Sequence, residues 1–195
     1  LQVKSRRSSS TTELVYQILW PKERKGEGFL LRKSGNRATS GAMLILPNTL
    51  KNLSASDMKD GIFGSDLTYE DLVENFYNWN DQSIIGTEEV NGVSCQILES
   101  KSGGSQSPYS KVQSWIDLKR MVPMRVDKYS SSGKLARRIL TTRVAKDDTG
   151  REIPASLSIQ GPGLGAPTII EGASSKHDVN FTDADFTPEA IGKLK

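Results

Sequence analysis

Apolar and polar residues alternate along much of the chain, and the pattern is clearest between residues 111 and 144. Val122, Met124 and Val126 stand at every second position, so they share one face of a strand. A glycine-containing turn is expected at residues 131–134, since glycine adopts the positive φ of tight hairpins. This stretch predicts a meander of three antiparallel strands with one apolar face.

The same period of two runs through the first third of the chain. Residues 1–7 alternate apolar and charged side chains, which predicts an edge strand. Residues 13–20 put Tyr16 and Trp20 on one apolar face, and Pro21 ends that strand. Asn91–Gly92 is a strong hairpin signal. Further strands are expected at residues 28–33, 42–46, 50–53, 83–90, 93–98, 151–160 and 168–173, and a last one around Val179 and Phe181.

The period changes in the stretch that follows residue 58. Tyr69, Leu72 and Phe76 recur at helical spacing, so about ten residues are expected to form an amphipathic helix. Thr68 and Asp71 have the spacing of a capping box at its start. With roughly ten strands, the pattern predicts a mainly β (α+β) fold in which one large sheet curls on itself.

Composition limits what such a sheet can do. The 195 residues fit one domain, and the hydrophobic share of 35% favours a thin-walled sheet over a densely filled core. The net charge is +3, and basic and acidic residues are interspersed along the chain, so the sequence shows no strong basic patch of the kind that binds nucleic acid. Cys95 stands alone, which excludes an internal disulfide, and we expect it to be a buried structural thiol. No apolar run approaches the roughly 20 residues that span a bilayer.

Reactive groups are sparse and do not form a recognisable motif. His177 is the single histidine and lies in a polar segment, without a Gly-x-Ser-x-Gly elbow before it. Residues 161–165 resemble a phosphate loop only in their glycine count. Asp147–Asp148 and the aspartates at 183 and 185 lack the ligand spacing of an EF-hand. We therefore expect no enzyme activity, no metal site and no cofactor.

Three segments together resemble one known family. They are residues 63–72 (FGSDLTYEDL), residues 115–134 (WID, then PMR, a tyrosine and GK) and residues 181–194. These segments resemble the LolA-like proteins that sort outer-membrane lipoproteins in Gram-negative periplasms, and the first is similar to an uncharacterised branch of them. The resemblance runs from about residue 14 to the end of the chain.

The resemblance implies an incomplete antiparallel barrel of about ten to eleven strands, with helices packed in its concave face, formed by residues 1–195 as one domain. It implies a periplasmic, monomeric carrier or chaperone that holds acyl chains of lipoproteins or other lipids in an apolar cavity, with residues 61–79 as a gate. Partner proteins of the inner- and outer-membrane sorting machinery are also implied, whereas nucleic acid is not. The N-terminal helix of the family, and a signal peptide, are expected to be missing from this chain. The candidate lining residues are Trp20, Phe29, Leu31, Met43, Ile45, Phe63, Leu72, Phe76, Met124 and Val126.

Two other functions remain open at this stage. The same fold can serve as a lipoprotein-sensing or protein-interaction module that does not carry lipid. An esterase-like enzyme would have to use His177, and the substitution His177→Ala would then abolish hydrolysis.

Overall fold

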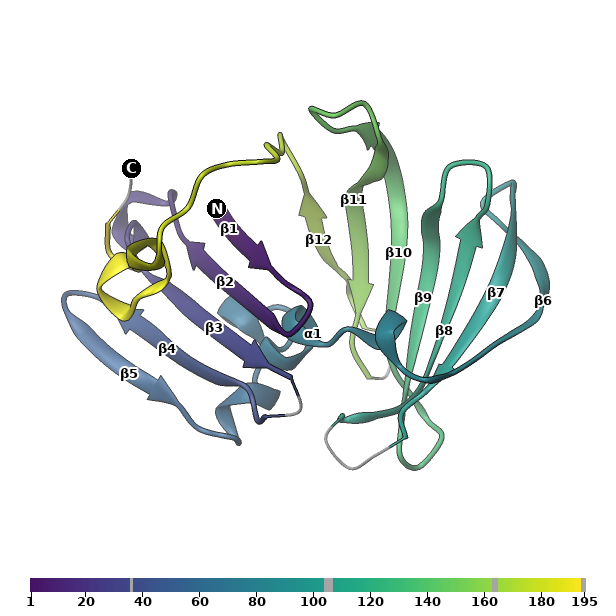
Figure 1. The fold of residues 1–195 in the computed structure, drawn as a ribbon, viewed down its shortest axis with the longest axis horizontal. Coiled ribbons are helices and arrows are strands. Elements are labelled where there is room, and N and C mark those ends of the chain that lie inside the picture. Colours follow the sequence, from purple (N-terminus) through teal and green to yellow (C-terminus); the bar gives the residue numbers. More distant parts are fainter. Residues whose placement is uncertain (36, 104–106, 163–164, 194–195) are drawn as a thin grey trace. The chain divides into compact units, whose positions relative to one another are not determined.

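The computed structural model describes residues 1–35, 37–103, 107–162 and 165–193. In these residues the chain forms two antiparallel sheets, of five and seven strands, joined by short helical turns (Figure 1). The predicted mainly β fold is confirmed. The expectation of one sheet with ten to eleven strands is wrong, because the strand ladder is interrupted between residues 53 and 81 by turns and one short helix.

The five-stranded sheet has the order of the sequence, β1 to β5. Its strands are β1 (Gln2–Arg7), β2 (Thr11–Gln17), β3 (Gly28–Ser34), β4 (Ser40–Ile45) and β5 (Thr49–Leu53). The one α-helix of the described residues, α1 (Tyr69–Val73), belongs to the same compact unit. So do the turns η1 (Lys22–Arg24), η2 (Asp57–Lys59), η5 (Asp183–Phe186) and η6 (Pro188–Ala190).

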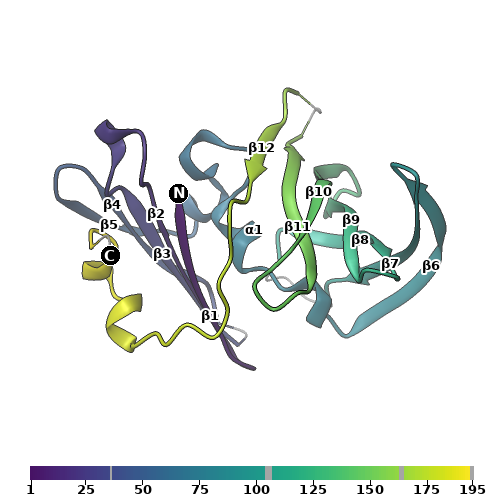
Figure 2. The ribbon, with the colours of Figure 1, turned by 90° about the horizontal axis from the view of Figure 1, so that it is seen from above.

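Side chains alternate between the two faces of this sheet, and each face has its own cover. Cross-strand pairing aligns Tyr16, Phe29 and Met43 on one side, where Tyr69 of α1 packs against Phe29. We call this side the helix face. Val15 and Leu30 point the other way. There they pack with buried residues of the turns near the C-terminus, and we call this side the tail face (Figure 2).

The seven-stranded sheet is also an uninterrupted meander, in the order β12 to β6. The predicted hairpin at Asn91–Gly92 is confirmed: both residues have positive φ, 51° and 77°, as a tight primed turn requires. The three strands of the central meander are confirmed as well. The strands are β6 (Asp81–Val90), β7 (Val93–Lys101), β8 (Tyr109–Asp117), β9 (Val122–Ser130), β10 (Leu135–Lys146), β11 (Glu152–Gln160) and β12 (Thr168–Glu171).

Two local expectations are wrong. The helix predicted to run for about ten residues is only five residues long, and a separate turn, η4 (Phe76–Asn78), follows it. Tyr69 packs against Phe29 of the five-stranded sheet, whereas Phe76 packs on the Tyr109, Val112 and Val126 cluster of the seven-stranded sheet, so the two residues belong to different compact units. The strand expected around Val179 and Phe181 is absent from the described residues, and Phe181 instead packs edge-to-face on Phe186.

Candidate functional site

The helix face is the candidate site, because apolar and aromatic side chains from three neighbouring strands meet there. The Phe29 ring stacks on the Tyr16 ring, with centroids 4.8 Å apart and planes inclined by 11°. The Tyr69 ring meets Phe29 edge-on at 4.8 Å, and its hydroxyl donates to the Met43 Sδ at 3.4 Å. Adaptable thioether and aromatic groups of this kind accommodate apolar ligands of variable shape.

Gly41 sets the shape of the helix face beside this aromatic group. A Cβ at Gly41 would lie 2.8 Å from a methyl carbon of Leu31 and 2.9 Å from one of Leu53. Those two leucines therefore converge in the space that the missing side chain leaves. Leu31 is fully buried and Leu53 nearly so, so this end of the face is closely packed.

A single helical turn covers the aromatic group. The predicted capping box is confirmed: the Thr68 backbone N–H donates to the Asp71 carboxylate at 2.9 Å, and the Asp71 backbone N–H donates to the Thr68 Oγ1 at 3.3 Å. An isolated bridge between Gly61 and Thr68 holds the start of this turn. A helix of five residues is marginal by itself, so the packing of Tyr69 and Val73, both buried, keeps α1 in place.

Burial keeps the tyrosines of this site in their neutral form. It raises the pKa of Tyr16 to about 12. Burial, helped by the negative charges of Asp60 and Asp57, also raises the pKa of Tyr69. Both phenols therefore stay protonated throughout the physiological range, and what they offer a ligand is a ring and a neutral hydroxyl. The arrangement is suited to binding an apolar group.

The structure brings some of the predicted lining residues together. Phe29, Leu31, Met43 and Ile45 lie on the helix face, and Leu72 belongs to the helix that packs against it. Trp20 does not join them: its strand ends at Gln17, and the Trp20 side chain is 80% exposed. The other four predicted residues, Phe63, Phe76, Met124 and Val126, belong to the second compact unit.

In the second unit, the predicted residues fall into separate groups. Val126 and Phe76 share an apolar cluster with Tyr109 and Val112. Met124 packs in another cluster, with Trp115 and with Cys95, whose predicted burial is confirmed. Phe63 adopts a left-handed backbone with φ of 52°, which is unusual for an aromatic residue. Lys128 was not singled out in the sequence. Its side chain is nearly fully buried, at 1% exposure, and its Nζ lies 5.0 Å from the centroid of the Tyr109 ring.

Tyr16, Leu53 and Tyr69 also lie on or against the helix face, and they were not among the residues predicted from the sequence. The sequence did indicate the orientation of Tyr16: it stands two positions after Leu14 in the same strand, so the two side chains share one face. Tyr69 was recognised as part of the helix, but only the pairing of β3 with β4 shows that Phe29 and Met43 lie beneath it.

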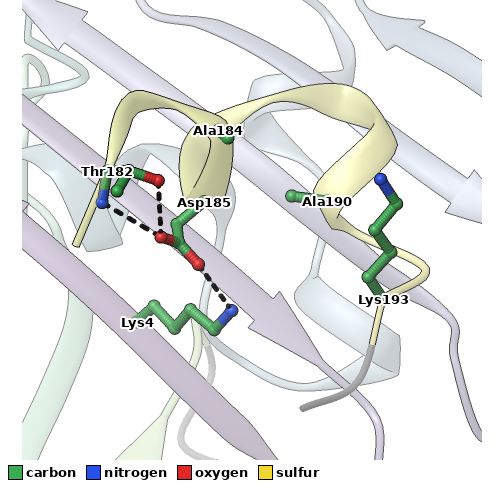
Figure 3. A pocket seen from close by; sticks show the side chains of 6 residues that line it. All are labelled: Lys4, Thr182, Ala184, Asp185, Ala190 and Lys193. Carbon is green, nitrogen blue, oxygen red and sulfur yellow. Dashed lines mark hydrogen bonds and ion pairs between the residues drawn. The ribbon is translucent and has the colours of Figure 1, made fainter.

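A small hollow on the tail side of the same sheet is unsuited to a long ligand (Figure 3). Its volume is about 190 Å³, below the range of roughly 300–1,000 Å³ that is usual for ligand pockets. The Asp185 carboxylate accepts from the Thr182 backbone N–H and hydroxyl, and it pairs with Lys4 at 3.5 Å. These contacts fasten the C-terminal turns to β1, so the hollow is part of a structural joint.

A family model with the description "Uncharacterized protein" matches residues 10–193. The chain belongs to this family. No curated protein matches the chain. None of the helices in the described residues has the length and hydropathy that crossing a membrane requires.

Several solved structures have a fold similar to that of this chain. A domain from Vibrio parahaemolyticus named for outer membrane lipoprotein sorting is similar with a TM-score of 0.85 at 18% identity, covering 98% of this chain and 82% of that one. A DUF1329 family protein from Desulfovibrio piger is similar with a TM-score of 0.86 at 22% identity, with coverages of 97% and 82%.

A LolA superfamily protein from Nitrosomonas europaea is similar with a TM-score of 0.68 at 16% identity, covering 93% of this chain and 78% of that one. The resemblance to LolA-like lipoprotein-sorting proteins that the sequence indicated is therefore confirmed at the level of the fold.

Proposed function

We propose that this protein is a non-enzymatic periplasmic carrier or chaperone that binds the acyl chains of lipoproteins or of other lipids. The observation that carries the proposal is the helix face, an apolar and aromatic surface on a LolA-like fold. Acyl chains have no hydrogen-bonding groups, so a dry apolar surface is sufficient to bind them. Each methylene removed from water contributes about 0.8 kcal/mol, so a long chain gains ample affinity even after the costs of ordering.

The segment at residues 61–79 is proposed to act as the gate. Its helix α1 has five residues and covers Phe29 and Met43 through the Tyr69 side chain. Displacing one short turn exposes this aromatic group at a smaller cost than moving a whole strand, because strands are fixed by ladder hydrogen bonds on both sides. The incomplete barrel with helices in its concave face, the single domain and the monomeric state stay predictions.

The carrier proposal is tested by placing a charge on one face of the sheet and then on the other. Ile45 lies on the helix face, and Leu50, which pairs with Leu44, lies on the tail face. Their exposed fractions are similar, 40% and 47%, so we expect the folded state to tolerate glutamate about equally well at either position. We expect Ile45→Glu to weaken the binding of a fluorescent long-chain fatty acid by delipidated protein at least tenfold, because acyl chains cannot solvate a carboxylate.

Leu50→Glu is the matched control and should bind within about twofold of the unmodified protein. Native mass spectrometry after co-expression with a lipoprotein should show a lipid-sized adduct that Ile45→Glu loses. An unmodified protein that takes up no fatty acid, or two variants with equal affinity, would contradict the proposal.

One observation favours the second candidate function, a lipoprotein-sensing or protein-interaction module without carrier activity. Strand β6 is at an edge of the seven-stranded sheet, and it exposes Ile84 by 62% and Ile85 by 48%. Edge strands with exposed apolar side chains are surfaces on which another chain can pair. This function predicts that affinity capture yields one stoichiometric protein partner and no lipid, and that Ile84→Lys abolishes the capture.

A further inference from the structure

The connection between β2 and β3 exposes a tryptophan to solvent, and we call its residues 18–27 the Trp20 loop. Trp20 is 80% exposed, the largest exposed fraction of any large apolar side chain in the described residues, and its neighbour Leu19 is 41% exposed. Apolar side chains that are exposed singly are common on protein surfaces. A largely exposed indole beside an exposed leucine is a larger apolar surface, and it points to a partner outside the folded chain.

The Trp20 loop has a backbone structure of its own. Two backbone hydrogen bonds close its base: the Ile18 N–H donates to the Glu27 carbonyl at 2.8 Å, and the Gly26 N–H donates to the Ile18 carbonyl at 3.0 Å. The turn η1 lies between them, and the Arg24 guanidinium donates two hydrogen bonds to the Glu27 carboxylate, at 2.9 and 2.8 Å. The loop is therefore held in a defined shape, and in this shape the indole lies in solvent.

The exposed charges of the Trp20 loop are positive in sum. Lys22 and Lys25 are both exposed, and the exposed acidic residue of the loop is Glu23. The Glu27 carboxylate is paired with Arg24 at 2.8 Å, so these two charges balance each other. Lysine can lay its aliphatic stem along an apolar surface while its ammonium group stays in a polar one. The loop thus combines an exposed aromatic group with basic side chains only a few positions away.

The turn between β4 and β5 lies beside the Trp20 loop. A Cβ built at Gly26 would be 3.9 Å from a methyl carbon of Leu46 in this turn. The two connections are at the same end of the five-stranded sheet, as the meander order requires (Figure 1). Leu50, near the start of β5, is 47% exposed. The Trp20 loop therefore belongs to an end of the sheet that exposes further apolar surface.

We propose that the Trp20 loop docks the protein on the surface of a lipid bilayer that contains anionic lipids. Trp20 and Leu19 would enter the interfacial layer, where the indole keeps its ring in an apolar environment and its N–H in a polar one. Lys22 and Lys25 would contact the anionic head groups, and each basic side chain near such a surface strengthens binding roughly fivefold. With one loop and two lysines, the docking is weak and reversible.

A bilayer fits this loop better than a protein partner or a second copy of the chain. A specific protein interface buries at least about 1,000 Å² and is depleted in lysine at its core, whereas a bilayer can be reached by the few side chains of one loop. A second copy that met this loop with its own loop would bring Lys22 and Lys25 close to the same positive charges, which repel each other. The charge of the loop therefore favours an anionic surface.

Co-sedimentation of the delipidated full chain with vesicles tests the proposal. We expect the chain to bind vesicles of phosphatidylcholine mixed with phosphatidylglycerol at least about fivefold more tightly than vesicles of phosphatidylcholine alone, and added salt should reduce this difference. Trp20→Ala should weaken binding to the mixed vesicles at least about tenfold, because the largest apolar group is lost. The double substitution Lys22→Glu and Lys25→Glu should remove the preference for anionic vesicles, and Glu23→Gln should strengthen it.

Tryptophan fluorescence reports directly on the loop. Trp115 is buried and Trp79 is half-buried, so Trp20 supplies most of the emission that iodide can quench. Mixed vesicles should shift the emission to shorter wavelength and protect it from iodide. Trp20→Ala should lose both effects, whereas Trp20→Phe should keep part of the vesicle binding.

Two variants serve as matched controls, and circular dichroism verifies that every variant is folded. Ile169→Ala removes another exposed apolar side chain, which is 56% exposed in the second compact unit. The double substitution Lys134→Glu and Lys146→Glu changes the net charge by the same amount as the double substitution in the loop, also at exposed positions. Both controls should bind mixed vesicles within about threefold of the unmodified protein.

The proposal is overturned if the unmodified protein does not bind mixed vesicles, or if Trp20→Ala binds them as tightly as the Ile169→Ala control. A shift of the Trp20 emission that grows with protein concentration in the absence of vesicles would assign the loop to a second copy and would also overturn it. Uptake of a fluorescent fatty acid, measured on the same samples, separates this inference from the carrier proposal. Trp20→Ala should keep that uptake within about twofold, because Trp20 lies outside the helix face. Uptake without vesicle binding would overturn the docking inference alone, and vesicle binding without uptake would overturn the carrier proposal alone.

Discussion

Phe186→Ala is expected to lower the free energy of unfolding by about 3–5 kcal/mol, the usual cost of removing a large buried aromatic side chain. Phe186 is fully buried on the tail face, where it packs with Val15, Leu30 and Ile191. Its ring meets Phe181 edge-to-face at 5.5 Å, and the Arg6 guanidinium lies 4.7 Å from its centroid. The residue therefore joins the C-terminal turns to the sheet.

Urea denaturation followed by circular dichroism measures this loss, and limited proteolysis reports whether residues 180–193 become accessible. Phe186→Leu is the matched control: it keeps the position apolar, fills much of the volume and should cost less than about 1.5 kcal/mol. If Phe186→Ala lowered the free energy of unfolding by less than about 1 kcal/mol, the packing of the C-terminal turns on the tail face would not be a major source of stability.

The second large loss of stability is expected when Asp127 is substituted. Its side chain is fully buried between two arginines of the seven-stranded sheet. Arg138 donates two hydrogen bonds to its carboxylate, at 2.9 and 2.8 Å, and Arg125 donates two more, at 3.1 and 2.5 Å. Removing one member of a buried ion pair leaves the others uncompensated, which costs about 3–5 kcal/mol. Because both arginines are partly exposed, we expect Asp127→Ala to lower the free energy of unfolding by about 3 kcal/mol.

The stability that the Asp127 carboxylate contributes should depend on pH, and measuring that dependence is a second test of this prediction. Burial acts to raise the pKa of the carboxyl, but the hydrogen bonds from Arg138 and Arg125 outweigh it, and the pKa is lowered. A lowered folded-state pKa gives stability that is fully present above the unfolded value of about 3.9 and is lost as the pH falls toward the folded value. The difference between the unmodified protein and Asp127→Ala should therefore shrink below about pH 4.

Arg138→Lys is a useful comparison, since it keeps the positive charge but loses the forked geometry, and it should cost less than Asp127→Ala. If the difference in stability between Asp127→Ala and the unmodified protein were the same at pH 3 and at pH 7, the charge network would not be its cause.

Much of the secondary structure could be predicted because its signals are local. The hairpin at Asn91–Gly92 depends on two residues that tolerate positive φ, and the capping box depends on Thr68 and Asp71, three positions apart. Trp20 shows the limit of such reasoning. It continues the alternation of β2, but the backbone pairing with the next segment ends with the hydrogen bonds of Ile18 to Gly26 and Glu27, and the Trp20 side chain beyond it is exposed.

The apolar residues of the helix face could be predicted to be buried, but the sequence could not show which of them lie together. Alternation indicates that Phe29 and Met43 are each apolar and inward, and the pairing of β3 with β4 places them opposite each other. Met124 and Phe29 have the same local pattern and yet pack in different compact units. Their local patterns carry no information on which sheet a strand will join.

The sequence by itself determined the mainly β fold and the positions of most turns, because periodicity and turn chemistry act over a few residues. The likeness to lipoprotein-sorting proteins came instead from the resemblance of residues 63–72, 115–134 and 181–194 to that family. Only the tertiary structure decided that the strands divide into two sheets and that the predicted helix stops at Val73. It also decided that His177 meets a turn 29 positions away in sequence. Such contacts depend on which apolar faces bury each other, and that choice is made by the whole folded chain.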